Sequence, residues 1–277
     1  MMNHWLVRIL VFVVAICAPF AAIFVVEFEP EDALNIQALM YGIACIAVVA
    51  IEHGRRGSTM IASGLLPTPW SPRLVLYGVL WAALAASVVL SAALLAGGSM
   101  EALAAPSVTV PGLTSIVLFA IGEEVVFRGT ILEALNERFG SVVSVSITSA
   151  LFAAAHAGNP GASIISTVNV GLAGMALGWM VLTTSSLWTA IGFHVVWNLL
   201  LAAVFGVVSG IDLGVGIVKL NTDAVSSDLR PWITGTFGVE EGYVTTIVLT
   251  LSVVFLTRVI PYDPYVRAAR LRRAFSS

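Results

Sequence analysis

Long apolar runs, separated by short polar segments, divide the chain and predict membrane-spanning helices. A helix that crosses the hydrocarbon core of a bilayer needs roughly 20 mostly apolar residues. The expected helices cover about residues 5–26, 34–51, 74–95, 112–139, 141–156, 163–182, 187–208 and 243–260. The fold class that we expect is therefore all-α, a polytopic transmembrane bundle of about eight spans.

Breaks in this pattern set the predicted order of the helices. The sequence Gly-Asn-Pro-Gly at residues 158–161 is a strong helix-breaking signal and ends the fifth helix. The join at 183–186 leaves room only for a tight reversal, and the longest loop covers about 209–238. We find no repeat and no second domain, so residues 1–277 form one predicted integral-membrane domain, with a motif-bearing core at about 112–205.

The composition supports a membrane protein and excludes several other classes. The chain is 58% hydrophobic and 10% charged, whereas soluble domains are about half apolar and a quarter charged. A soluble enzyme, a nucleic-acid-binding protein and a disordered chain are all excluded. Cys17 and Cys45 lie in apolar runs and give no disulfide framework. The bilayer is thus the first expected partner, and nucleic acid is not one.

Basic residues predict the orientation of the bundle, because cytoplasmic loops are enriched in Lys and Arg. With eight spans, both chain ends lie on one side of the membrane. That side holds most of the 13 basic residues, and the other side holds Lys219 and Arg230. Those on the richer side are Arg8, Arg55, Arg56, Arg73, Arg138, Arg258, Arg267, Arg270, Arg272 and Arg273. We therefore expect cytoplasmic termini.

The fourth predicted helix carries charges where charges are costly. It reads Ile-Gly-Glu123-Glu124-Val-Val-Phe-Arg128-Gly, and a charge at mid-bilayer costs roughly 2.5 to 3.5 kcal/mol on insertion scales. Glu124 and Arg128 are four residues apart with the acid first, the favourable order for a helical ion pair. Glu123 then lies about a hundred degrees round the helix, where a buried carboxylate needs a partner from another helix.

Three polar residues on other helices are candidate partners for Glu123. His156 ends Leu-Phe152-Ala-Ala-Ala-His156, while His194 and Asn198 are four residues apart and share a helix face. Taken singly, each is as much a structural hydrogen-bonding group as a functional one. Together the four suit peptide hydrolysis, with Glu123 as base, His156 sharing the water proton, and His194 and Asn198 as oxyanion donors.

These residues resemble three motifs of the CAAX protease and bacteriocin-processing family of intramembrane proteases. EEVVFR (123–128), FAAAH (152–156) and HVVWN (194–198) match the patterns EExxxR, FxxxH and HxxxN or HxxxD in the family's order. The resemblance implies an endopeptidase similar to the Ras-converting type II CAAX prenyl endopeptidase. It implies catalytic roles for Glu123, His156, His194 and Asn198, with Glu124, Arg128 and Phe152 in support.

The resemblance leaves the metal and the substrate open. Family members have also been described as metalloproteases, and Glu123, His156 and His194 would make an acceptable zinc site. We favour a mechanism without a cofactor, with zinc as the alternative. The expected partner is a membrane-bound protein or peptide substrate, prenylated CAAX sequences included. The competing functions are a proton-coupled transporter or channel and a non-proteolytic membrane scaffold of the same family.

Overall fold

The computed structural model describes residues 71–258, with the exception of residue 214. The predicted spans at 5–26 and 34–51 and the basic tail lie outside the described residues. Among the described residues, the α-helices are α4 (Ser71–Leu95), α5 (Val110–Glu123), α6 (Leu132–Phe139), α7 (Ser141–His156), α8 (Ile164–Thr184), α9 (Leu187–Leu200), α10 (Arg230–Ile233) and α11 (Tyr243–Arg258). The π-helices are η1 (Glu124–Ile131) and η2 (Leu201–Phe205), the 3-10 helix is η3 (Val239–Glu241), and the strands are β1 (Ser99–Ser107) and β2 (Gly216–Asn221).

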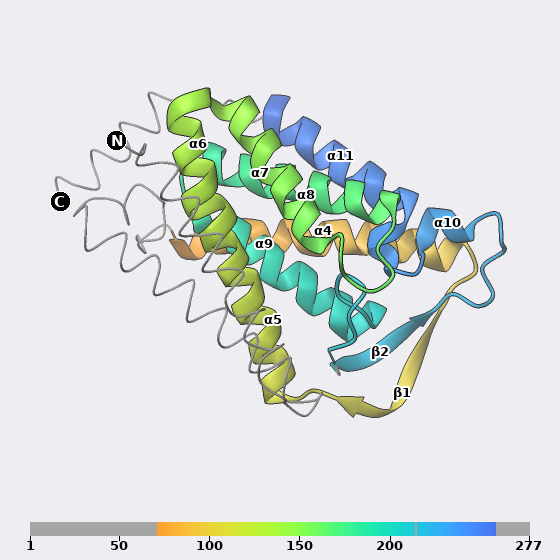
Figure 1. The fold of residues 1–277 in the computed structure, drawn as a ribbon. Helices are drawn as coiled ribbons and strands as arrows, with labels where there is room; N and C mark the ends of the chain where they lie inside the picture. The colour runs from red at the N-terminus through yellow and green to blue at the C-terminus, as the bar shows by residue number, and fades with distance from the viewer. Residues whose placement is uncertain (1–70, 214, 259–277) are drawn as a thin grey trace.

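The chain is mostly helical, and the helix positions follow the apolar pattern (Figure 1). The expected helix at 112–139 is one continuous run of α5, η1 and α6, and α7 has the predicted bounds. Of the described helices, three are long and apolar enough to cross a membrane: α4, α8, and α9 together with η2. Two shorter apolar helices, α7 and α11, accompany them. These features are those of an integral membrane protein, and the number of eight spans stays a prediction.

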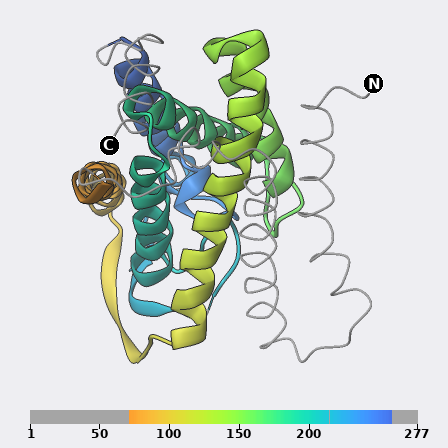
Figure 2. The ribbon, with the colours of Figure 1, turned by 90° about the vertical axis from the view of Figure 1, so that its left-hand side faces the viewer.

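Helices α4 and α9 are packed backbone against backbone. In Figure 2, α4 is seen end-on while α9 is seen from the side, so the two axes cross steeply. Gly78 and Gly192 lie at the crossing, where a Cβ on Gly78 would collide with the Thr189 carbonyl oxygen. A Cβ on Gly192 would lie 2.6 Å from the Val75 carbonyl oxygen. Small residues let two membrane helices approach to backbone contact, and this contact fixes the position of α9.

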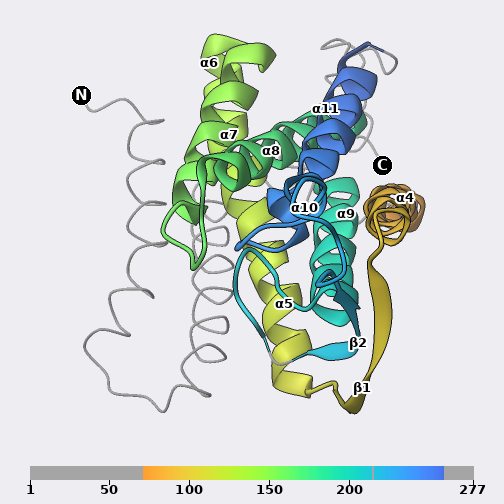
Figure 3. The ribbon, with the colours of Figure 1, turned by 90° about the vertical axis from the view of Figure 1, so that its right-hand side faces the viewer.

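A two-stranded antiparallel sheet corrects the expectation of an all-α fold. β1 pairs with β2, with Ser99 opposite Asn221 and Glu101 opposite Lys219 (Figure 3). The Asn221 side-chain amide also donates a hydrogen bond of 2.6 Å to the Glu101 carboxylate. The sequence pattern indicated only connecting loops at these places. The two strands are more than a hundred residues apart in the chain, so local periodicity carries no information on their pairing.

The described basic residues outside the site gather toward two ends of the molecule. The start of α4, the α6–α7 turn and the end of α11 lie toward the left of Figure 1, whereas the sheet and α10 lie toward the right. Arg73, Arg138 and Arg258 belong to the first group of elements, and Lys219 and Arg230 belong to the second. This separation is consistent with the charge asymmetry predicted for the two sides of the membrane. Which end is cytoplasmic stays a prediction.

Candidate active site

A change in helix type marks the acidic motif. Glu123 is the last residue of α5, and from Glu124 to Ile131 the same rod continues as the π-helix η1. π-Helical turns are rare and are found frequently at functional sites. Gly129 lies against Leu187 of α9, where an added Cβ would come within 3.1 Å of the leucine side chain. The widened turn and this glycine bring η1 close to α9, the helix that carries His194.

Glu124 is completely buried, with 0% of its surface exposed, and it forms the expected ion pair. Its Oε1 accepts a hydrogen bond of 2.8 Å from Arg128 Nη1. Arg128 Nη2 also donates to the Gly174 carbonyl oxygen of α8 at 3.2 Å, and its guanidinium lies 4.3 Å from the centre of the Phe152 ring. Charge-assisted and cation–π contacts of this kind are strong when water is excluded. The pair therefore ties η1 to α7 and α8.

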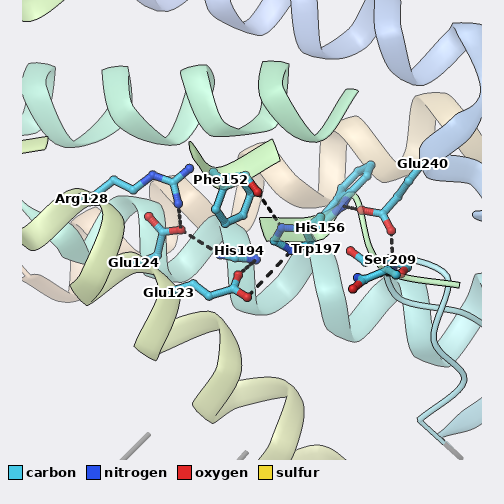
Figure 4. Close-up of polar contacts among 10 residues, drawn as sticks. Glu123, Glu124, Arg128, Phe152, His156, His194, Trp197, Ser209 and Glu240 are labelled. Atoms are coloured by element: carbon cyan, nitrogen blue, oxygen red, sulfur yellow. Dashed lines mark hydrogen bonds and ion pairs between the residues drawn. The ribbon is translucent and has the colours of Figure 1, made fainter. Parts of the chain in front are cut away.

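The carboxylate of Glu123 faces two histidines from two other helices (Figure 4). Its Oε1 lies 3.9 Å from His156 Nε2, at the end of α7, and its Oε2 lies 3.6 Å from His194 Nε2, in α9. The Glu123 side chain is 18% exposed. Three residues that are 33 to 71 positions apart in the chain thus come together at one point. The structure supplies the partners from other helices that a buried carboxylate requires.

The other nitrogen of each histidine ring is held in place. His194 Nδ1 lies 2.8 Å from Glu124 Oε1, and His156 Nδ1 lies 2.9 Å from the Phe152 carbonyl oxygen. Both partners are acceptors, so Nδ1 carries a hydrogen in each ring and Nε2 faces Glu123. The Phe152 ring packs on His156, with ring centres 4.5 Å apart, and meets His194 edge-on at 6.0 Å. Phe152 and Glu124 thereby orient both imidazoles.

A cavity adjoins these groups, and Asn198 lies on its wall. Asn198 follows His194 by one turn of α9, and its side-chain amide has no hydrogen-bond partner among the described residues. The amide is therefore available to a molecule bound in the cavity. The lining residues are Phe152, His156, Asn169, Val170, Ala173, Leu177, Phe193, His194, Trp197, Asn198, Ser209, Glu240, Thr245 and Leu249.

The donor chemistry around Glu123 suits zinc. One carboxylate and two imidazole Nε2 atoms are an ordinary ligand set, and ligating histidines typically donate Nδ1–H to a carbonyl or a carboxylate, as both do here. In the arrangement of residues 71–258, no three His, Cys, Asp or Glu side chains converge to hold a metal ion. Glu123, His156 and His194 are the residues that would hold one.

Glu240 is a cavity residue that the sequence analysis did not identify. It lies in η3 and is 9% exposed. Its Oε2 accepts a hydrogen bond of 2.6 Å from the Ser209 backbone N–H, and its Oε1 lies 3.5 Å from Trp197 Nε1. Burial raises the pKa of the Glu240 carboxyl, and the hydrogen bond from Ser209 opposes this change.

Buried Asn169 of α8 holds the backbone around Glu240. Its side-chain amide donates to the carbonyl oxygens of Glu240 and Gly242 at 2.8 and 3.2 Å, and its oxygen accepts from Thr246 at 2.7 Å. The only signal in the sequence was the acid pair before the last apolar run, Val-Glu240-Glu241-Gly. Acids before a helix have a simpler explanation, since they favour its positive N-terminal end.

A comparison with known protein families finds a match over the segment that carries the three motifs. Residues 105–200 match a family model described as Type II CAAX prenyl endopeptidase Rce1-like. The matched segment contains all three sequence motifs, and the resemblance seen in the sequence is thereby confirmed. No curated protein matches the chain.

Proposed function

We propose, from the match of residues 105–200 to the Rce1-like endopeptidase family, that the protein is an intramembrane endopeptidase. Its substrate is a membrane-associated protein or peptide that is cut near its C-terminus, and prenylated CAAX sequences are the first candidates. The observation that supports this proposal is the Glu123 carboxylate, which lies 3.9 and 3.6 Å from the Nε2 atoms of His156 and His194.

In the first step, Glu123 acts as the general base. A water molecule that approaches the space between Glu123 and His156 gives a proton to the carboxylate, while its oxygen forms a bond to the scissile carbonyl carbon. His156 shares the water hydrogen bond, and its ring is held by the Phe152 carbonyl oxygen. The product of this step is a tetrahedral oxyanion and a protonated Glu123.

Asn198 and His194 stabilise the oxyanion. The free amide of Asn198 donates one hydrogen bond from the cavity wall, and protonated His194, which has Glu124 and Glu123 beside it, donates a second from Nε2. When the oxyanion collapses, the C–N bond breaks and the proton on Glu123 passes to the leaving amine. The Glu124–Arg128 pair takes no part in bond making, because it serves to hold η1 and the His194 ring.

Zinc is the alternative to this metal-free mechanism. Bound by Glu123, His156 and His194, the ion would lower the pKa of a water ligand and polarise the scissile carbonyl. In that case Glu123 is a ligand and not the free base, so sensitivity to a chelator separates the two mechanisms.

The test compares the purified wild type with Glu123→Gln, each with and without a strong zinc chelator. A farnesylated CAAX peptide serves as substrate, and mass spectrometry follows release of its C-terminal tripeptide. We expect Glu123→Gln to lose about 10²- to 10⁴-fold in rate, the usual contribution of a general base, and the chelator to have no effect on the wild type.

Glu137→Gln is the matched control, because Glu137 is an exposed acid on the same helical rod. It should cleave at the wild-type rate. Full activity of Glu123→Gln would remove Glu123 from the mechanism, and inhibition by the chelator would favour the zinc site. A folded wild type that cleaves no peptide would favour the transporter or the scaffold.

A further inference from the structure

Glu240 is a buried acid with no Lys or Arg partner among the described residues. Within residues 71–258, no Lys or Arg lies within ion-pair distance of its carboxylate, and its two hydrogen-bond donors, Ser209 N–H and Trp197 Nε1–H, are neutral. A buried carboxylate is costly unless it is paired with a positive charge. Its environment is therefore incomplete for the charged form.

Among the described residues, the imidazoles of His156 and His194 are the groups whose charge would favour ionised Glu240, and neither lies within hydrogen-bond distance of its carboxylate. A carboxylate has about four acceptor positions, and two of those on Glu240 are in use. The contact with Trp197, at 3.5 Å, is long for a hydrogen bond. Glu240 thus keeps acceptor capacity toward the interior of the cavity. The other ionisable side chains on the cavity wall are His156 and His194.

The remaining cavity wall is largely apolar. It includes Leu177, Phe193, Trp197 and Leu249. Of the candidate catalytic residues, His156, His194 and Asn198 line the same space, and Glu123 lies beyond the two histidines. In Figure 4, Glu240 lies on the far side of His156 from Glu123. The enclosed volume is about 30 Å³, so it has room for the cationic head of a side chain whose aliphatic stem packs along the apolar wall.

We propose that Glu240 is a specificity-determining residue that binds a lysine or arginine side chain of the substrate, next to the scissile peptide bond. The part that concerns the peptide rests on the proposed endopeptidase function. The binding of the cation does not, so the two can be tested separately.

The first experiment measures binding without proteolysis. The full-length protein in detergent is heated with pentylamine or with pentanol, which has the same chain length but no charge. We expect the amine, and not the alcohol, to raise the melting temperature of the wild type, and Glu240→Gln to abolish this shift. Glu241→Gln is the control, because the Glu241 carboxylate accepts from Phe237 N–H in a neighbouring turn and should leave the shift unchanged.

A second variant keeps the proposal testable if Glu240→Gln does not fold. Glu240→Asp retains the charge but withdraws it by one methylene group. The wild type and this variant are compared across a series of linear alkylamines from butyl to heptyl. We expect the preferred amine to become one carbon longer in Glu240→Asp. Equal protection of the wild type and Glu240→Gln by pentylamine, or an unchanged preferred length in Glu240→Asp, would overturn the proposal.

The second experiment uses peptides that differ only beside the scissile bond, where they carry Lys or its neutral analogue norleucine. We expect the wild type to prefer Lys in kcat/KM by about thirtyfold or more, since losing one partner of a buried charge pair has at least this effect. In Glu240→Gln the ratio should fall toward one, and in Glu241→Gln it should stay. A wild-type ratio near one would contradict the proposal. If no peptide is cleaved, the endopeptidase function fails, and the amine series still decides the role of Glu240.

Discussion

Two buried carboxylates, Glu124 and Glu240, stand at opposite ends of the row of polar groups in Figure 4, and their surroundings differ in one respect. Glu124 has the guanidinium of Arg128 at 2.8 Å. Glu240 accepts hydrogen bonds from a backbone N–H and an indole N–H, and the imidazoles of His156 and His194 share its cavity without bonding to it. Both are buried, but among the described residues only Glu124 has a guanidinium in direct contact with its carboxylate. An acid with its own cation is part of the framework, whereas an acid without one is suited to receive a ligand.

The comparison also clarifies the position of Glu123 between them. Its partners are two histidines from α7 and α9, and its side chain remains partly exposed. Glu123 therefore differs from both: it has no arginine bound to it as Glu124 does, and its partners are imidazoles rather than the neutral donors that bond to Glu240. These three environments, one for each carboxylate, are consistent with three tasks: support, proton transfer and recognition.

Removal of the cation beside Glu124 should have the largest effect on stability. We expect Arg128→Met to lose about 3 to 5 kcal/mol of unfolding free energy, because it leaves a buried carboxylate unpaired. Unfolding in detergent, followed by circular dichroism, measures the loss. The double variant Arg128→Met/Glu124→Gln should recover part of it. If Arg128→Met were as stable as the wild type, Glu124 would not depend on its cation, and the proposed difference between Glu124 and Glu240 would be wrong.

Asn198, on the cavity wall that also holds Glu240, should affect rate more than stability. Asn198→Ala removes an amide with no partner among the described residues, so we expect little change in unfolding free energy. Peptide hydrolysis should slow by about a hundredfold or more if the amide is an oxyanion donor. Asn136→Ala, on α6, is the matched control and should have the wild-type rate. Equal kcat values for Asn198→Ala and the control would show that the Asn198 amide is not an oxyanion donor and that the residue serves only in packing.

The hydrogen bond from Trp197 to Glu240 should contribute little. Trp197→Phe removes the indole N–H but keeps the aromatic stack on Phe193, whose ring planes are 10° apart. We expect a loss of about 1 kcal/mol or less, since a neutral hydrogen bond has about this net value and this one is long. Thermal unfolding checks the value. A loss as large as that of Arg128→Met would show that the hydrogen bonds of Glu240 stabilise the fold as much as the Glu124–Arg128 ion pair does.

The pH dependence should show the smallest effect and have a definite sign. Because burial raises the pKa of Glu240 above its ordinary 4.5, the folded state holds this proton more tightly than the unfolded state. The contribution of this proton to the free energy of unfolding is fully present below the pKa of Glu240 in the unfolded chain. It is lost as pH rises through the pKa of Glu240 in the folded protein. Unfolding free energy, measured from pH 4.5 upward, should therefore decline less in Glu240→Gln than in the wild type. The Glu241→Gln control should follow the wild type, and identical slopes in all three proteins would contradict the prediction.

The sequence predicted those parts of the structure that depend on local periodicity and spacing. The helix at 141–156 has its predicted bounds, and the pairing of Glu124 with Arg128 followed from their separation of four residues. The convergence of Glu123, His156 and His194 was expected because each charge or imidazole in an apolar helix needs a partner. The catalytic roles of these residues stay predictions.

What the sequence could not predict is non-local. The strand pairing of Ser99 with Asn221 and the contact of Glu240 with Ser209 depend on how distant segments pack. The same holds for Asn169, which resembles any polar residue in an apolar helix until η3 and α11 are placed beside it. The π-helix at Glu124 also escapes a periodicity of 3.6, because its residues still fit an apolar helical run.

That π-helix has a consequence for how the protein tolerates insertions and deletions. A wide turn of this kind accommodates more residues than a regular one over the same length of rod. Removing one residue between 125 and 127 would let the rod return to regular winding, but it would place Arg128 three residues from Glu124. Adding one residue there has no such compensation: each later residue would turn by about a hundred degrees about the axis, and the face that α6 presents to α7 would rotate away. We therefore expect a change of length to be tolerated far better in the turn between β2 and α10 than between Glu124 and Arg128.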